Sequence, residues 1–341
     1  MRYIGGKSLL VNNISDCILS YTDNVQSIFD IFAGTGVVTQ DLLLKGYNLL
    51  SNDILYFSYV LLRGSIGLNH TPTFDKLGID NPIDYLNSLN LYDTNLNKSD
   101  LFIYNNYSPT GNCNRMYFQP HNALKIDIIR LTIEQWFSYN KITEDEYYYL
   151  LASLIKAVPY VSNIAGVYAA YLKHWDKRTF NNITLTDNPI NPTGRSCKCL
   201  NSDYLKVIET PVDLLYADPP YNSREYLPNY HLLETIARYD YPEIKGVSGM
   251  RDYQHIKSPF CSKKNVEAAF ENLMKLSNAR YLLISYNNEA LLPTARLTEM
   301  CSDYAINDSF RLIEIDYRRY KSKIPNNNSG LKEQLYFLQL K

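Results

Sequence analysis

The chain has 341 residues, of which 45% are hydrophobic and 20% charged, and its formal net charge is −1. This length excludes a short peptide module and predicts two domains, or one domain with a large insertion. The pI of about 6.5 argues mildly against a nucleic-acid partner, but phosphate is bound by a local basic face and not by the average charge.

The N-terminal segment, residues 2–7, reads Arg-Tyr-Ile-Gly-Gly-Lys. Taken alone, two glycines before a lysine are typical of an ordinary loop. Residues 8–21 follow with Leu10, Ile14 and Ile18 at helical spacing, which predicts an amphipathic helix.

A glycine-rich turn comes next. Residues 27–32 are strand-like, the turn carries Gly34 and Gly36, and residues 37–45 suit a helix. Such a turn lets a ligand approach the backbone closely. Thr39 stands where a dinucleotide fingerprint would have its third glycine, so the pattern favours a compact nucleoside over a pyrophosphate.

An acidic residue follows the second predicted strand, residues 47–51. Asp53 lies 19 residues after Gly34, and a carboxylate at that distance is suitably placed for the hydroxyls of a ribose. Together the glycine turn and Asp53 predict a cofactor cleft.

The pattern then changes between the second strand and residue 197. Residues 69–114 are polar with little periodicity, whereas residues 122–139 and 144–158 carry apolar residues at helical spacing. We therefore predict a mostly helical insertion, residues 63–196, which divides a sheet domain made of residues 1–62 and 197–341.

Two groups of basic residues are candidates for phosphate contacts. Residues 166–178 interleave aromatic and basic side chains, and a second group lies near the C-terminus. Both groups could equally be solvated helix and hairpin faces. The candidate phosphate-binding residues, which would contact DNA if the chain binds nucleic acid, are Lys173, Lys177, Arg178, Arg318, Arg319 and Lys321.

The catalytic signal lies at the end of an apolar run, residues 212–217, which predicts a buried strand. Asp218, Pro219, Pro220 and Tyr221 follow it, and two prolines end a strand because neither has an N–H and each fixes φ. One carboxylate and one ring thus project from a stiff turn, at the strand end where open α/β sheets bind ligands. An Asp-Pro pair by itself would predict only a turn.

Beyond this turn we predict a strand over residues 282–288 and a closing hairpin, with strands at 311–319 and 334–340 around a mobile loop at 325–330. The six cysteines form no C-x-x-C pair, so we expect no metal site and reduced thiols. No apolar stretch reaches the length of a bilayer span. We expect a soluble, cytoplasmic protein with no membrane partner.

The order of these motifs resembles the Dam-type (alpha-group) adenine-N6 DNA methyltransferase family, which includes type II restriction-modification methylases. The resemblance covers nearly the whole chain. It implies an α/β fold with the Rossmann-like sheet of S-adenosylmethionine-dependent methyltransferases. It also implies that the mostly helical insertion is the target-recognition region. The matching segments are the opening residues 2–7, Phe32-x-Gly34-x-Gly36, Asn52-Asp53, Asn201-Ser202-Asp203-Tyr204 and Asp218-Pro219-Pro220-Tyr221.

Roles for individual residues follow from the resemblance. Asp218, Pro219, Pro220 and Tyr221 would be catalytic, with Tyr221 stacking on the extruded base. Asp203 and Tyr204 would hold the adenine of the cofactor. The residues implied to bind S-adenosyl-L-methionine are Tyr3, Lys7, Phe32, Gly34, Gly36, Asp53, Asp203, Tyr204 and Asp218.

The resemblance implies a site-specific enzyme that methylates N6 of a flipped adenine in double-stranded DNA, inside a bacterium or phage-infected cell. A cognate restriction endonuclease would be a partner without a stable complex. Three alternatives stay open: cytosine-N4 in DNA, an amino group of RNA or a protein amide as acceptor. A catalytically silent DNA-binding module is a fourth. A cytosine-C5 methylase would need a Pro-Cys pair, which Pro259-Phe260-Cys261 does not supply.

Overall fold

The computed structural model describes residues 4–90, 96–109, 113–190, 192–316 and 330–341. The chain forms two compact units. A helical unit comprises Met1–Gly6, Leu55–Gly194 and Tyr226–His255, and a sheet unit comprises Lys7–Ile54, Arg195–Glu225 and Ile256–Lys341. The chain passes between the units several times, so neither is a continuous stretch of sequence.

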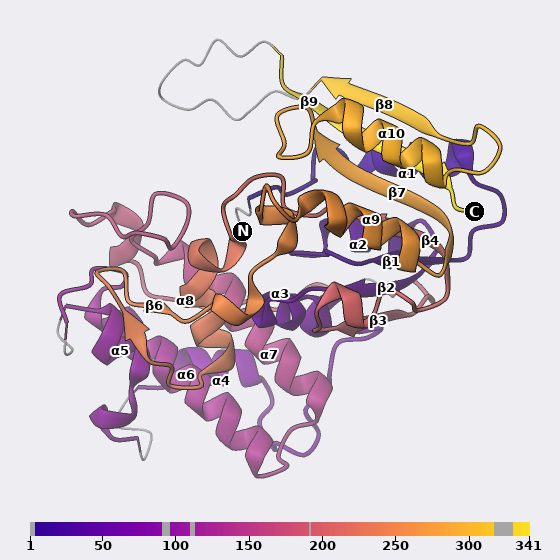
Figure 1. Ribbon diagram of the computed structural model, residues 1–341. Coiled ribbons are helices and arrows are strands. Elements are labelled where there is room, and N and C mark those ends of the chain that lie inside the picture. The colour runs from indigo at the N-terminus through magenta and orange to yellow at the C-terminus, as the bar shows by residue number, and fades with distance from the viewer. Residues whose placement is uncertain (1–3, 91–95, 110–112, 191, 317–329) are drawn as a thin grey trace. The chain divides into compact units, whose positions relative to one another are not determined.

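The sheet unit is built on seven strands in the order β3-β2-β1-β4-β7-β9-β8 (Figure 1). The first five run parallel, whereas β9 is antiparallel to both of its neighbours. The parallel strands therefore present their carboxyl ends at one edge, where ligands of open α/β sheets bind. The strands are β1 (Ser27–Asp30), β2 (Asn48–Asn52), β3 (Cys197–Leu200), β4 (Val212–Ala217), β7 (Ala279–Asn287), β8 (Arg311–Asp316) and β9 (Lys332–Gln339).

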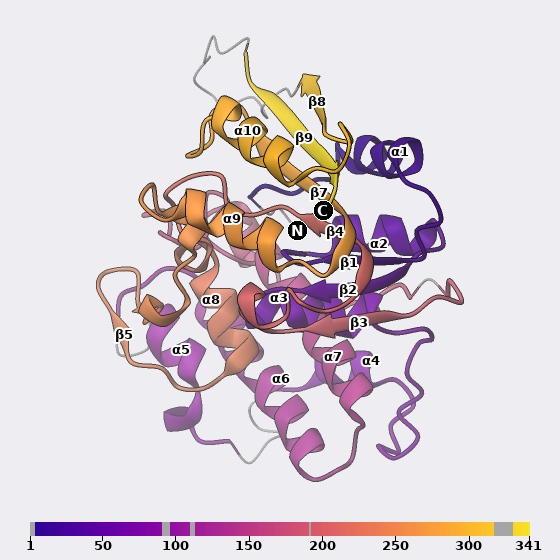
Figure 2. The same cartoon turned by 45° about the vertical axis from the view of Figure 1, so that its right-hand side comes forward.

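Helices cover both faces of this sheet (Figures 1 and 2). Successive side chains of β9 point to opposite faces of the sheet. The Phe337 ring lies 5.5 Å from the Tyr21 ring of α1 on one face, whereas Tyr336 packs into the core on the other face. Buried on both faces, β4 and β7 are apolar almost throughout. One face carries α1 (Val11–Tyr21) and α2 (Val37–Leu44), and the other carries α9 (Val266–Leu276) and α10 (Thr294–Tyr304).

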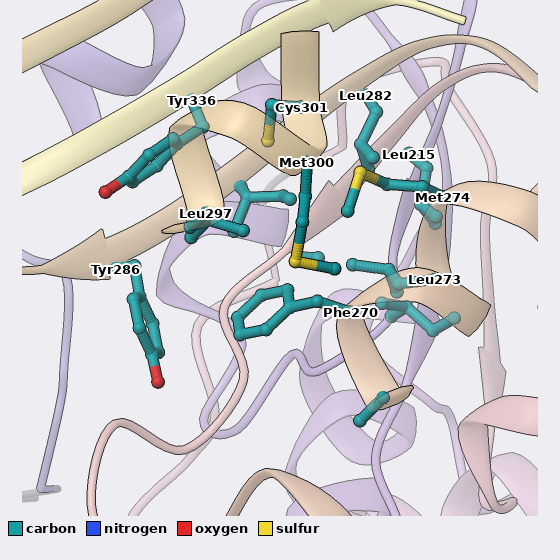
Figure 3. Close-up of a cluster of buried hydrophobic side chains, with 14 of the residues drawn as sticks. Leu215, Phe270, Leu273, Met274, Leu282, Tyr286, Leu297, Met300, Cys301 and Tyr336 are labelled. Carbon is teal, nitrogen blue, oxygen red and sulfur yellow. The ribbon is translucent and has the colours of Figure 1, made fainter. Parts of the chain in front are cut away.

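The main core of the sheet unit lies under α9 and α10. Figure 3 shows side chains from both helices interleaving with those of the strands. This packing fixes the strands whose ends carry the candidate site. The labelled members are Leu215, Phe270, Leu273, Met274, Leu282, Tyr286, Leu297, Met300, Cys301 and Tyr336.

The helical unit is organised by three longer helices. The helix α7 begins with a capping box, in which the Thr143 side chain accepts from the Glu146 N–H and the Glu146 carboxylate accepts from the Thr143 N–H. The helix α6 begins with a proline, Pro120, in its first turn. The α-helices are α3 (Tyr56–Leu61), α4 (Pro82–Ser88), α5 (Phe102–Tyr107), α6 (Pro120–Ser138), α7 (Glu144–Ala157) and α8 (Tyr226–Arg238).

Short elements complete both units. A π-helical turn, η1 (Leu62–Ile66), extends α3, and a small hairpin of β5 (Ile244–Lys245) and β6 (Met250–Arg251) belongs to the helical unit. The 3₁₀ turns are η3 (Lys98–Asp100), η4 (Val158–Tyr160), η5 (Lys177–Phe180), η6 (Tyr204–Lys206), η7 (Gln254–Ile256) and η8 (Pro259–Cys261).

The structure confirms a mixed α/β chain with a mostly parallel sheet, and it confirms the predicted strands and the two long helices α6 and α7 within a few residues at each end. Residues 69–114, expected to be irregular, contain α4 and α5. Residues 325–329 of the predicted loop at 325–330 lie outside the described residues. Over the described ranges, no helix is long and apolar enough to cross a membrane.

Candidate active site

The catalytic turn, residues 218–221, directly follows the last residue of β4, as predicted. The Asp218 side chain is only 17% exposed. Its Oδ1 accepts a hydrogen bond of 2.7 Å from the Tyr221 hydroxyl and lies 3.0 Å from Nζ of Lys7. Both of these contacts fall on one oxygen. Within the part of the chain that the structure describes, Oδ2 is left available to an incoming donor.

Lys7 and Tyr221 belong to a larger buried polar cluster. Nζ of Lys7 donates to the Tyr221 oxygen at 2.5 Å, and Oε2 of Glu333 on β9 lies 3.2 Å from that oxygen and 4.0 Å from Nζ. The Ser285 hydroxyl also lies 3.2 Å from the Tyr221 hydroxyl oxygen. A phenol has one proton and can donate to one carboxylate at a time, and the shorter distance favours Asp218.

The charges of this cluster do not balance. Two carboxylates, Asp218 and Glu333, share one ammonium. Burial raises the pKa of the Asp218 carboxyl, and the neighbouring Lys7 ammonium opposes that rise. Burial likewise raises the pKa of Glu333, again against Lys7. The cluster therefore has excess negative charge when both carboxylates are ionised.

The glycine turn lies at the end of β1, and both of its glycines need left-handed backbone. Gly34 has φ of 56° and Gly36 has φ of 78°, a region that side chains with a Cβ avoid. The N–H of Gly34 donates to Oδ2 of Asp53 at 2.8 Å. Asp53 is 8% exposed and follows β2, the strand next to β1. The structure thus brings together the glycine turn and the acidic residue predicted to share a cleft.

Asp30, the last residue of β1, is a buried carboxylate at the same edge. It is 1% exposed, and its Oδ2 accepts a hydrogen bond of 2.7 Å from the Thr39 hydroxyl. Burial raises the pKa of Asp30 to about 7, and the charges of Asp218 and Asp53 add to the rise. Its Oδ1 has no hydrogen-bond partner among the described residues. Thr39, which replaces a third glycine, therefore anchors an acidic side chain.

Three aromatic rings form a cluster in the sheet unit. Phe32, Tyr204 and Phe260 have ring centroids 5.4 to 5.5 Å apart. Tyr204 is 6% exposed, while Asp203 caps the short turn η6 by accepting from the Leu205 N–H at 2.9 Å. The predicted Asp203-Tyr204 element is therefore present as a capped turn beside Phe32.

This element is tied to the end of β2 through the Asn52 side chain. Its Oδ1 accepts from the Ser202 N–H at 3.0 Å, and its Nδ2 donates to the Ser202 carbonyl at 3.0 Å. The same Nδ2 donates to the Ile31 carbonyl at 3.2 Å. One buried asparagine thus links the strand ends that carry Phe32, Asp53 and Asp203.

Three of the six predicted basic residues lie in the helical unit. Lys173 and Lys177 are exposed, but Arg178 is half-buried, donates from Nη2 to the Ile164 carbonyl and places Nε 3.8 Å from Asp176. Arg178 therefore helps to hold its own loop. Four predicted residues lie outside the described residues: Tyr3, Arg318, Arg319 and Lys321.

Sequence reasoning missed four residues of the sheet edge: Asp30, Phe260, Ser285 and Glu333. Asp30 and Glu333 were detectable in principle, because each is an acidic residue in or beside an apolar strand. Ser285 and Phe260 carry no such signal. For metal binding, the described residues contain no group of three or more His, Cys, Asp or Glu side chains suited to an ion.

Comparison with known proteins adds a second line of evidence. The profile of the family described as "D12 class N6 adenine-specific DNA methyltransferase" matches residues 3–300. The chain is 43% identical to the type II methyltransferase M.FokI of Planomicrobium okeanokoites, covering 99% of this chain and 52% of that protein. It is 40% identical to the modification methylase StsI of Streptococcus sanguinis, covering 100% of this chain and 52% of that protein.

A third relative has a similar length to this chain. The type II methyltransferase M.NlaIII of Neisseria lactamica is 34% identical, with 100% of this chain and 98% of that protein covered. The chain therefore spans about half the length of the first two relatives and nearly all of the third.

Proposed function

Because the chain belongs to the family of D12 class N6 adenine-specific DNA methyltransferases, we propose that it transfers a methyl group from S-adenosylmethionine to N6 of an adenine in double-stranded DNA. The observation that carries this proposal is the catalytic turn, where one oxygen of Asp218 is held by Tyr221 and faces Lys7 while the other is available. We infer that the sheet is Rossmann-like and that residues 63–196 recognise the target.

The residues at the sheet edge fit this cofactor. Asp53 offers a carboxylate for ribose hydroxyls, and Phe32 and Tyr204 offer ring faces for the adenine. Carboxylates outnumber ammonium groups here, which suits a donor with a positively charged sulfonium. Bound there, the cofactor would supply the activated methyl group. Lys7 and Tyr3 are proposed to contact its methionine end.

The chemistry proposed for Asp218 follows from the acceptor. The lone pair of adenine's amino group is delocalised into the ring, so the enzyme must localise it on nitrogen. Oδ2 of Asp218 and the carbonyl of Pro219 can each accept one amino hydrogen, which favours a tetrahedral nitrogen. Positioning and electrostatics supply most of the catalysis because the donor is already activated. In the transfer, the bond between the methyl group and the donor's sulfur would break as the N6–methyl bond forms, and one amino proton would then pass from the methylated nitrogen to solvent.

The stacking role of Tyr221 is constrained by its surroundings. The Lys7 ammonium lies 4.5 Å from the ring centroid over one face, and Tyr286 meets the ring in a T-shaped contact at 5.1 Å. A flipped adenine would therefore stack on the face opposite Lys7. The hydrogen bond to Asp218 anchors the hydroxyl end of the ring, and the T-shaped contact with Tyr286 restricts the orientation of its plane.

Access to the site requires the adenine to leave the duplex, at a cost of a few kcal/mol. Phosphate contacts from exposed basic residues would offset that cost. Lys173 and Lys177 are exposed and suited to this role, whereas the Arg178 side chain already donates a hydrogen bond to the Ile164 carbonyl. Arg318, Arg319 and Lys321 remain proposed contacts. Relatives named type II methyltransferases support a restriction-modification context. A cognate endonuclease that forms no stable complex with this chain is part of the proposal.

The proposal is tested by expressing the chain in a host that lacks DNA methylation and sequencing its genomic DNA for modified bases. N6-methyladenine at one recurring sequence motif is expected, and the Asp218→Ala variant should leave that motif unmodified. Modification at cytosine N4, or no modification by the folded wild-type protein, would contradict the proposal.

A further inference from the structure

Glu333 is a buried charged group that the proposed methyl transfer does not use. It lies on β9, an antiparallel strand two places from β4 in the sheet, and is 6% exposed. Its Oε2 reaches the Tyr221 hydroxyl and Lys7 but makes no contact with the available oxygen of Asp218. Its position therefore calls for an explanation separate from the hydrogen bonds to the acceptor base.

The balance of charges around Tyr221 explains the position of Glu333. Among the described residues, Lys7 is the basic group within 4.0 Å of Asp218, and it is also the basic group within 4.0 Å of Glu333. One ammonium can neutralise one of the two carboxylates. An excess buried charge is costly unless a counterion or ligand compensates it. Asp30 adds a third buried carboxylate whose charge interacts with Asp218.

We propose that Glu333 is a specificity-determining residue that makes the site prefer the positively charged methyl donor over the neutral product left after transfer. The inference rests on the proposed function, since it takes S-adenosylmethionine as donor and S-adenosylhomocysteine as product. These two molecules differ by one methyl group and one positive charge. A buried carboxylate near the site favours the first over the second through charge alone.

Glu333 acts on the ligand at a distance, through its charge, and it is not assigned a contact with the reacting atoms. The substitution Glu333→Gln separates its charge from its shape. Glutamine has nearly the same volume, and its amide oxygen can still accept the Tyr221 proton. The variant thus removes one negative charge while keeping the hydrogen-bonding capacity toward Tyr221.

A matched control lies on the neighbouring strand. Glu314 on β8 is 41% exposed and forms an ion pair with Lys332 at 2.6 Å. The substitution Glu314→Gln removes the same charge from the same unit, but at a solvent-screened position. Any general effect of net charge on ligand binding should appear in both variants.

The test is calorimetric titration of S-adenosylmethionine and S-adenosylhomocysteine into the wild-type protein and both variants. Glu333→Gln should lower the ratio of the two affinities about fivefold, the size expected for one charge at partly screened distance. The affinity for S-adenosylhomocysteine should change less than about twofold, and Glu314→Gln should keep the wild-type ratio.

Equal losses for both ligands in folded Glu333→Gln would overturn the inference, because they would indicate a purely structural role. Failure of the wild-type protein to bind S-adenosylmethionine would instead contradict the proposed function. The two failures are therefore distinguishable.

A second measurement covers the case in which Glu333→Gln does not fold. The affinity ratio is followed against pH in a variant that carries both Asp218→Asn and Asp30→Asn, because the Asp30 carboxyl also titrates at this edge of the sheet. Among the described residues, Lys7, Tyr221 and Tyr216 are then the titratable groups that interact with Glu333. Protonating Glu333 removes its charge, so the ratio should fall as the pH is lowered through its titration. A ratio that stays constant would overturn the inference.

Discussion

Two buried aspartates, one in each unit, differ in what their oxygens contact. Asp127 on α6 is fully buried, and its carboxylate accepts from the N–H groups of Ile103 and Tyr104 at 2.9 and 2.7 Å and from the Tyr239 hydroxyl at 2.5 Å. Both of its oxygens are occupied by protein donors. Asp218 keeps its two close contacts on Oδ1 and is partly exposed.

The difference separates a structural carboxylate from the one for which we propose a catalytic role. Asp127 satisfies N–H groups at the start of α5, a helix of six residues with no side-chain cap of its own. Burial raises the pKa of Asp127 to about 7, and the Tyr239 hydroxyl and the two N–H groups oppose that rise. Burial and a raised pKa therefore occur at both aspartates. The available oxygen is what distinguishes Asp218.

The sharpest test of this comparison is Asp218→Ala. Loss of the acceptor for the amino hydrogen should reduce methyl transfer by about a thousandfold. Affinity for S-adenosylmethionine should fall far less, by about the fivefold expected for one lost carboxylate charge, because the main assigned role is toward the acceptor base. Single-turnover transfer of labelled methyl to DNA measures the first quantity and calorimetry the second. Activity within about threefold of wild type would remove Asp218 from its assigned role.

Asp127→Ala tests the structural role of the second aspartate, and it should destabilise the fold. It leaves two backbone N–H groups and a tyrosine hydroxyl without their acceptor, which should lower the free energy of unfolding by about 3 kcal/mol. Urea denaturation measures this loss. The control is Asp75→Ala in the same unit, an exposed position expected to change stability by less than about 0.5 kcal/mol. Equal effects at the two positions would argue against a structural role for Asp127.

Asp53→Ala extends the test to the cofactor cleft. Removing a buried carboxylate that should bind the ribose is expected to weaken S-adenosylmethionine binding by about 1 to 3 kcal/mol. Calorimetry checks this value, with Asp16→Ala, an exposed position on α1, as the control. If the folded Asp53 variant keeps wild-type affinity, the ribose is held elsewhere.

The smallest expected effect concerns the exposed lysines of the helical unit. Replacing Lys173 and Lys177 with Ala should reduce the slope of log K for DNA against log salt by about 2 units, if each contacts one phosphate. Arg178 is kept because it holds its loop. The control pair, Lys76 and Lys141, is exposed in the same unit. An unchanged slope would indicate that the DNA-binding face lies elsewhere, and the next candidates would be Arg318, Arg319 and Lys321.

Local patterns predicted much of this molecule. The apolar run of β4 ended by two prolines, the glycines before α2 and the helical spacing in α6 and α7 all depend on neighbours close in sequence. These patterns also identified Asp53 and Asp218 as site candidates, and the family resemblance added Lys7. The structure brings Lys7 to Asp218 and Gly34 to Asp53.

Contacts between distant residues were beyond the reach of these patterns. Glu333 lies 112 residues from Tyr221, and the strand pairing that brings them together depends on the whole sheet. The short helix α5 was missed for the same reason, because the carboxylate that holds its first turn comes from Asp127, 24 residues from Ile103. Neither short-range periodicity nor capping motifs carry this information.

Nucleoside analysis of unmethylated DNA, incubated with labelled S-adenosylmethionine and purified protein, tests the central claim most directly. Three proteins are compared: wild type, Asp218→Asn and folded Asp127→Asn. We expect label in N6-methyladenine with wild type and with Asp127→Asn, and none with Asp218→Asn. Label in N4-methylcytosine, or wild-type incorporation by Asp218→Asn, would contradict the assignment of Asp218 as the carboxylate that accepts from the adenine amino group.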